Sequence, residues 1–95
     1  MHVITRKRLN DFVAAHPRAL GPLERWYRLM KRGSFEIFAQ LRALFPSADQ
    51  VGNKTVFNLG GNKYRLVAAI HYNRCKVYIR HVLTHVEYDE SRWKE

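Results

Sequence analysis

The spacing of apolar residues changes near Val51, and this change decides which class of fold the chain can adopt. Before that point, apolar residues recur at the three- and four-residue spacing of helices. After it they alternate at every second position, as they do in strands. Helices followed by strands indicate an α+β fold. The chain has 95 residues, close to the typical domain size of roughly 100–150, so we expect a single domain over 1–95.

Three helices are expected in the first half, at about 6–15, 22–32 and 35–45. Thr5 and Ser34 would cap the first and the third. The first ends at His16-Pro17, because the residue before a proline is pushed out of helical geometry. Gly33 is a natural end for the second. The residues expected to be buried in these helices are Leu9, Phe12, Val13, Leu23, Trp26, Tyr27, Met30, Phe35, Phe38, Leu41 and Leu44.

Four strands are expected, over 3–4, 54–59, 63–72 and 75–85. Gly60-Gly61-Asn62 and the two residues Asn73-Arg74 would form the hairpin turns between them. The last two strands carry apolar residues on both faces, which predicts central positions in the sheet. Strict alternation places His81 on the same face of the last strand as Val77 and Ile79. Residues 87–94 would form a helical turn or a tail.

The chain is strongly basic, which bears on its partners. It holds 17 Lys and Arg against 8 Asp and Glu, for a net charge of +9. Eleven of the 17 are Arg, whose planar fork matches phosphate oxygens. Such a charge attracts a nucleic acid, an acidic protein or a membrane surface, and of these we favour nucleic acid.

The sequence also indicates where in the cell the protein is expected, because it lacks the features of membrane and secreted proteins. The longest uninterrupted apolar run covers 66–70, far below the roughly 20 residues of a membrane span. The first residues have no apolar stretch of the kind found in a signal peptide. A single cysteine, Cys75, allows no internal disulfide framework. We therefore expect a cytoplasmic protein without a membrane partner.

No acidic residue occurs between Asp49 and Glu87. The same stretch holds cations at Lys54, Lys63, Arg65, Arg74, Lys76 and Arg80, and histidines at 71, 81 and 85. Strands with cations at alternate positions and no carboxylates are typical of a phosphate-binding surface. The alternative is a solvated basic face that binds nothing.

The same lack of carboxylates argues against a metal-dependent nuclease, so no metal or other cofactor is expected. His81 and His85 would share a strand face, but four residues along a strand span about 13 Å, too far to share a zinc ion. Cys75 on an apolar strand is interpreted as a small core residue rather than a nucleophile.

Metal-free RNA cleavage fits the residue types that are present. A base takes the proton of the 2′-hydroxyl, a cation steadies the phosphate, and an acid protonates the leaving oxygen. His85 and Tyr88 lie three residues apart where the last strand ends. By alternation Arg65 falls opposite the apolar Tyr64 and Leu66, so we expect it on a solvent-facing surface near Lys63 and His85.

The sequence resembles the HigB-type toxins of bacterial toxin–antitoxin modules, in the RelE/ParE superfamily. Two motifs carry most of the likeness: Asn58-Leu59-Gly60-Gly61-Asn62-Lys63-Tyr64-Arg65, and Thr84-His85-Val86-Glu87-Tyr88-Asp89. Shorter matching stretches cover 1–4, 44–49 and 78–80. The resemblance runs nearly from end to end.

This resemblance implies a RelE-like fold, in which N-terminal helices pack on a small, mostly antiparallel sheet. It implies an endoribonuclease that cleaves mRNA on the ribosome without a metal, and a HigA-like antitoxin with a helix-turn-helix region. By matching position, the catalytic residues would be His85, Tyr88 and the phosphate-binding Arg65. The residues expected to bind RNA are Lys54, Lys63, Arg80 and Asn62, although Asn62 could serve the turn instead.

Two other functions stay open at this point. ParE-type relatives of the same superfamily act on gyrase, so the chain could inhibit a nucleic-acid machine without cutting RNA. A basic module whose charge only pairs with an acidic protein is the third possibility.

Overall fold

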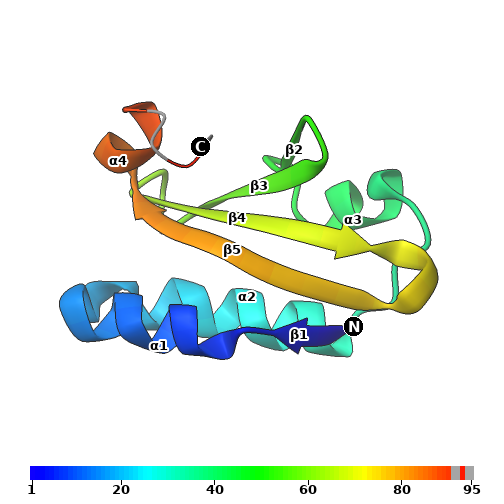
Figure 1. The fold of residues 1–95 in the computed structure, drawn as a ribbon, viewed down its shortest axis with the longest axis horizontal. Helices are drawn as coiled ribbons and strands as arrows, with labels where there is room; N and C mark the ends of the chain where they lie inside the picture. The colour runs from blue at the N-terminus through cyan, green and yellow to red at the C-terminus, as the bar shows by residue number, and fades with distance from the viewer. Residues whose placement is uncertain (91–92, 94–95) are drawn as a thin grey trace.

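The computed structural model describes residues 1–90 and 93. The elements, in chain order, are β1 (His2–Ile4), α1 (Arg6–Ala15), the 3₁₀ turn η1 (Pro17–Ala19), α2 (Leu20–Arg32), α3 (Phe38–Leu44), β2 (Asp49–Val51), β3 (Lys54–Leu59), β4 (Tyr64–His71), the 3₁₀ turn η2 (Tyr72–Arg74), β5 (Lys76–Thr84) and α4 (His85–Asp89) (Figure 1). The strands form one sheet in the order β1-β5-β4-β3-β2. β1 runs parallel to β5, and the other neighbouring pairs are antiparallel. The predicted α+β fold with a mostly antiparallel sheet is confirmed.

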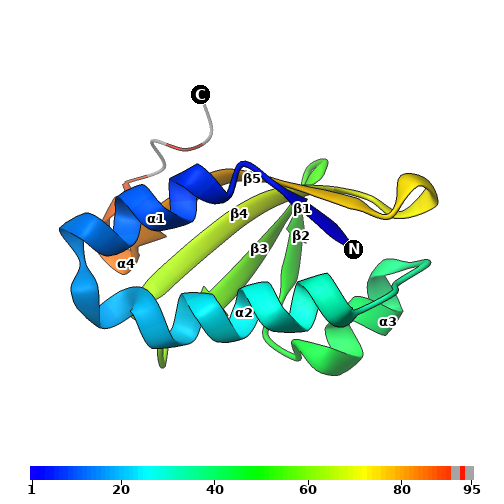
Figure 2. The same ribbon diagram turned by 90° about the horizontal axis from the view of Figure 1, so that it is seen from below.

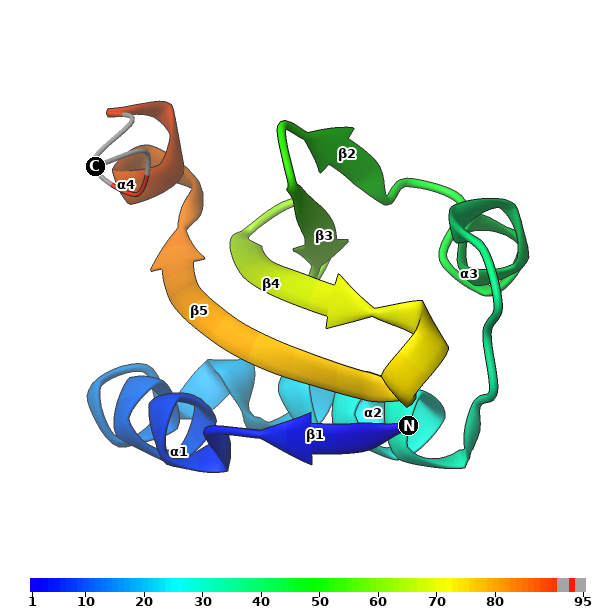
Figure 3. The same cartoon turned by 45° about the vertical axis from the view of Figure 1, so that its right-hand side comes forward.

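The helices are unevenly distributed about this sheet. α1 and α2 lie on one side of it (Figure 1), and α2 crosses the strands when the sheet is seen from below (Figure 2). We call the face covered by these helices the inner face and the opposite one the outer face. α3 lies beside β2, and α4 stands at the end of the curved β5 (Figure 3).

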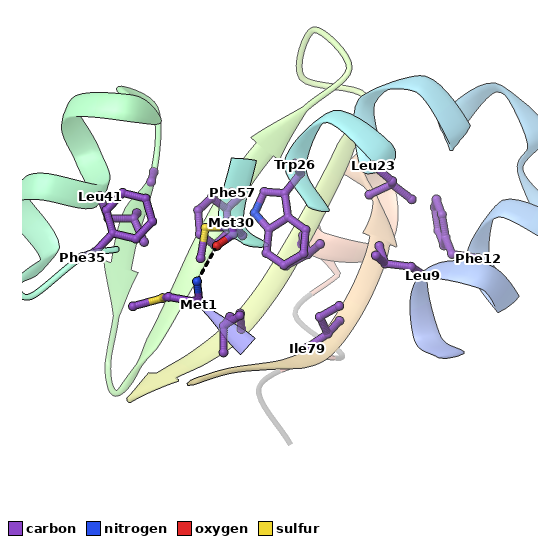
Figure 4. Close-up of a cluster of buried hydrophobic side chains, with 14 of the residues drawn as sticks. Met1, Leu9, Phe12, Leu23, Trp26, Met30, Phe35, Leu41, Phe57 and Ile79 are labelled. Atoms are coloured by element: carbon purple, nitrogen blue, oxygen red, sulfur yellow. Dashed lines mark hydrogen bonds between the residues drawn. The ribbon is translucent and has the colours of Figure 1, made fainter. Parts of the chain in front are cut away.

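The main core lies between α2 and the inner face. Trp26 is almost wholly buried and meets Phe57 edge to face, with ring centroids 5.5 Å apart. The amino group of Met1 enters the same region and donates to the carbonyl oxygen of Met30 at 3.0 Å (Figure 4). Most of the residues expected to be buried in the helices are so, among them Leu9, Phe12, Leu23, Trp26, Met30, Phe35 and Leu41. Val13, Tyr27 and Phe38 are half-buried, and Leu44 lies exposed at the end of α3.

Element boundaries agree with the sequence in most places. β3 covers the predicted range, α1 ends before Pro17, and α2 ends at Gly33. Other expectations were wrong: Thr5 stands at the N-cap position of α1 but makes no side-chain capping hydrogen bond, and α2 begins at Leu20 rather than Pro22. α3 begins only at Phe38, so Ser34 caps no helix, although Phe35 is buried. The short strand β2 was not predicted.

The connection between β4 and β5 also differs from the prediction. Asn73-Arg74 is not a two-residue turn, because Tyr72–Arg74 forms a 3₁₀ turn and Cys75 follows it with a φ of 53°. Cys75 is exposed in this left-handed conformation, so its interpretation as a core residue was wrong. Among the described residues, no helix is long and apolar enough to cross a membrane.

A β-bulge in β5 decides which side chains reach the outer face. Val67 pairs with His81, but the next residue, Ala68, pairs with Ile79, so Arg80 is the extra residue. Because paired residues share a face, His81 lies with Val67 on the outer face while Ile79 lies in the inner core. The expectation that His81 and Ile79 share a face was therefore wrong.

Candidate active site

The β3–β4 turn and the start of α4 meet at one corner of the outer face. The last pair of the β4–β5 ladder joins Tyr64 to Thr84. One residue beyond it, the backbone N–H of His85 donates to the carbonyl oxygen of Lys63 at 2.9 Å. The two motifs singled out in the sequence are thus held together by backbone hydrogen bonds.

The sequence of α4 fixes how this short helix begins. The hydroxyl of Thr84 accepts from the N–H of Glu87 at 3.2 Å, and the Glu87 carboxylate accepts from the N–H of Thr84 at 2.9 Å. This reciprocal capping box satisfies two backbone donors that a helix start leaves free. It sets the direction in which the side chains of α4 leave the sheet.

His85 lies exposed on the first turn of α4 and contacts an acidic partner. Its Nδ1 is 3.0 Å from Oδ2 of Asp89, four residues further on, and both side chains are about half exposed, at 50% and 58%. The carboxylate favours the imidazole tautomer with its proton on Nδ1, which leaves Nε2 able to accept a proton. Asp89 was not among the predicted site residues.

Arg65 lies near the predicted place but is buried, and the expectation of a solvent-facing side chain was wrong. The residue is only 8% exposed. Its Nη1 donates to the carbonyl oxygens of Asn62 at 2.9 Å and Tyr64 at 3.1 Å. The guanidinium also lies over the ring of Tyr88, 5.6 Å from its centroid. Arg65 therefore braces the β3–β4 turn beneath α4.

Tyr88 of α4 is the third predicted catalytic residue at this corner. Its ring stacks on Trp93 with centroids 5.0 Å apart and planes 7° apart. The Trp93 indole N–H donates to the Tyr88 carbonyl oxygen at 3.1 Å. Both rings pack on the small outer cluster formed by Val56 and Val67. Trp93 therefore holds the phenol ring of Tyr88 in place. The sequence pattern did not predict this contact.

The four predicted RNA-binding residues are not equally placed. Lys54 is half-buried at the start of β3, and Arg80 is exposed at the bulge, where it lies 5.6 Å from the ring centroid of Tyr78. Lys63 and Asn62 are exposed in the β3–β4 turn. Asn62 has a φ of 73°, and its carbonyl oxygen accepts from Arg65, so it serves the turn.

His81 adds a further basic group to the outer face. Burial lowers its pKa, and the nearby positive charges of Arg8, Lys54 and Arg80 lower it further. A cleft of about 400 Å³ beside it separates α1 from β5 and α4. Sequence reasoning excluded His81 as a zinc ligand but did not foresee its place among these cations.

Comparison with known proteins assigns the family. The HigB_toxin family, described as a RelE-like toxic component of a toxin–antitoxin system, matches residues 19–91. The chain belongs to the HigB family. It is 39% identical over 92 residues to the mRNA interferase toxin HigB of Escherichia coli strain K12, covering 94% of this chain and 88% of that protein. The mRNA interferase HigB of Shigella flexneri matches to the same extent. The mRNA interferase HigB of Escherichia coli O6:H1 is 27% identical over 93 residues, covering 95% of this chain and 90% of the relative.

The part of the chain matched to the HigB family includes this corner from the β3–β4 turn to α4, but it ends before Trp93. This corner offers an imidazole, a phenol and a guanidinium, which can move protons and hold a phosphate. Within residues 1–90 and 93, no three His, Cys, Asp or Glu side chains lie close enough together to hold a metal ion. The capping box could have been found from Thr84 and Glu87, whereas the contact of His85 with Asp89 can be found only once 85–89 is known to be a helix.

Proposed function

We propose that this HigB-family toxin is an mRNA interferase, an endoribonuclease that inhibits translation by cutting messages bound to the ribosome. The observation that carries this proposal is the corner where the Arg65 guanidinium lies over the Tyr88 ring and His85 begins α4, beside the strands β3, β4 and β5, which carry no carboxylate. The relatives named mRNA interferase support the same activity. The partners would be ribosome-bound mRNA and a HigA-like helix-turn-helix antitoxin, all in the cytoplasm.

The reaction needs no group from outside the chain. Nε2 of His85 takes the proton of the 2′-hydroxyl, whose oxygen attacks the adjacent phosphorus and forms a cyclic phosphate. The bond to the 5′-oxygen breaks, and Tyr88 gives its proton to that oxygen. Asp89 stabilises the imidazolium of His85 while the proton is held there, at the 3.0 Å contact already described.

Arg65 would supply positive charge to the crowded phosphate. Within the described residues both of its hydrogen bonds come from Nη1, which leaves Nη2 and Nε for phosphate oxygens. A guanidinium fixed in advance needs little reorganisation as the transition state forms, and this makes its charge more effective. Lys54, Lys63 and Arg80 would hold the neighbouring phosphates of the strand.

The test is cleavage of a defined message on translating ribosomes, with the new RNA ends mapped. We expect cuts by the native protein and a loss of about 10²–10⁴ in rate for His85→Ala. His2→Ala is the matched control, since His2 is exposed on the edge strand β1 and pairs with Lys76, at the end of β5 away from α4. Cleavage of the ribosome-bound message should also survive EDTA, with the effect of EDTA on the metal-stabilised ribosomes controlled for.

Three results would contradict the proposal. The first is full cleavage by His85→Ala, and the second is a chemical step that only magnesium or manganese restores. The third is growth inhibition without any cut message, which would favour a toxin that binds its target without cleaving RNA.

A further inference from the structure

A second basic surface lies on the helical side of the molecule, away from the outer face. A groove of about 710 Å³ runs along α2 and is closed by the α3–β2 connection and the β3–β4 turn. Figure 2 shows α2 crossing in front of the sheet, with α3 at one end. The described corner with His85 and Tyr88 lies outside this groove.

The lining of the groove combines an apolar floor with cations. Apolar side chains are contributed by Pro22, Leu29, Leu44, Phe45 and Leu59. Leu44 is 42% exposed at the end of α3, so its side chain is open to a partner. Arg25 and Arg28 stand on the α2 side, and a neighbouring hollow of about 200 Å³ adds Arg32. The three arginines recur at the spacing of one helix face.

These three arginines are exposed, and no carboxylate neutralises them within the described chain. The ion pairs found there use Arg6, Lys7 and His85 instead. Like charges three and four residues apart on a helix repel each other and destabilise it. A partner with negative charge would relieve the repulsion between these arginines. It would also cover the exposed apolar side chains beside them.

We infer that the groove binds an acidic, amphipathic segment of the antitoxin, with its carboxylates on the arginines and its apolar side chains on the floor. This inference rests on the proposed function for the existence of the antitoxin. A peptide is favoured over RNA because the floor is mostly aliphatic. Arginines around an apolar centre are typical of protein interfaces, whereas single-stranded RNA is held by exposed aromatic rings that stack on bases.

The experiment uses a full-length HigA-like antitoxin and measures its binding to the full toxin chain. The double variant Arg25→Glu, Arg28→Glu should bind at least about tenfold more weakly, while mRNA cleavage and melting temperature stay as in the native protein. Leu44→Ser tests the floor separately and should also weaken binding. The control is Arg18→Glu, Arg74→Glu, which makes the same change in charge at exposed positions outside the groove.

Each outcome decides one way or the other. Native-like antitoxin binding by both groove variants overturns the inference. So does a groove variant that keeps the antitoxin but loses mRNA cleavage on ribosomes, because the groove then contacts RNA. If the native toxin does not bind the antitoxin, the partner and the groove assignment both fail. If the native toxin binds it through the groove but cuts no message, only the proposed nuclease function fails.

Discussion

Replacing Arg65 with methionine should destabilise the fold as well as the site. The change keeps an unbranched apolar stem, although a shorter one, and removes the bonds to the carbonyl oxygens of Asn62 and Tyr64 and the contact with the Tyr88 ring. A hydrogen bond from a charged donor contributes about 1.5–3 kcal/mol, and a cation over an aromatic ring about 0.5–2 kcal/mol. Together the two bonds and the ring contact exceed about 3.5 kcal/mol, and burial of the apolar methionine side chain offsets part of their loss, so we expect the free energy of unfolding to fall by about 2–4 kcal/mol.

Thermal and urea unfolding at neutral pH measure this loss. In a domain of this size 1 kcal/mol shifts the melting temperature by about 4–8 °C, so Arg65→Met should melt at least about 8 °C lower. Arg80→Met is the control, because Arg80 is exposed and its loss should cost less than about 0.5 kcal/mol. A melting temperature for Arg65→Met within about 2 °C of the native value would refute the bracing role of the guanidinium.

Three further predictions concern neighbouring groups. Tyr88→Phe keeps the ring that stacks on Trp93, so it should melt like the native protein yet cut mRNA about 10²–10⁴ times more slowly; a wild-type rate would exclude the phenol as the acid. Asp89→Asn should slow cleavage without changing the melting temperature, and an unchanged pH–rate profile would show that the contact with His85 has no role in proton transfer. The pKa of His81 is lowered in the folded chain, so the unfolded chain binds the proton more readily and stability should fall as pH drops below about 6.5. His81→Gln should melt with a smaller loss between pH 7.5 and 5.5, and an equal loss would assign that pH dependence to other groups.

The sequence predicted the fold well wherever periodicity and turn residues agreed. Gly60 and Gly61 both adopt a φ of +61°, as the predicted hairpin requires. A methyl group on Gly60 would also lie 2.8 Å from the ring of Tyr64, so glycine is needed there for space as well. The apolar residues on both faces of β4 likewise predicted its central place in the sheet, because that pattern can be recognised within the strand itself.

Sequence pattern failed where a side chain's surroundings depend on distant parts of the chain. The bulge at Arg80 changes which side chains of β5 face the inner and outer sides of the sheet. No residue type at this position predicts a bulge. Arg65 was placed correctly opposite the inner core, but it is buried because α4 brings the Tyr88 ring over its guanidinium. The pairing of His85 with Asp89 required knowing that 85–89 is a helix, because only a helix brings residues four apart together.

The hydrogen bond from the His85 amide to Lys63 makes this one backbone N–H a reporter of site assembly. Whenever α4 separates from the β3–β4 turn, that amide is released to solvent and can exchange its hydrogen. The ratio of its exchange rate to that of an unprotected amide gives the fraction of time the corner is open. A message, an inhibitor or an antitoxin that tightens the corner would slow this exchange, so occupancy can be followed in catalytically dead variants whose turnover is zero.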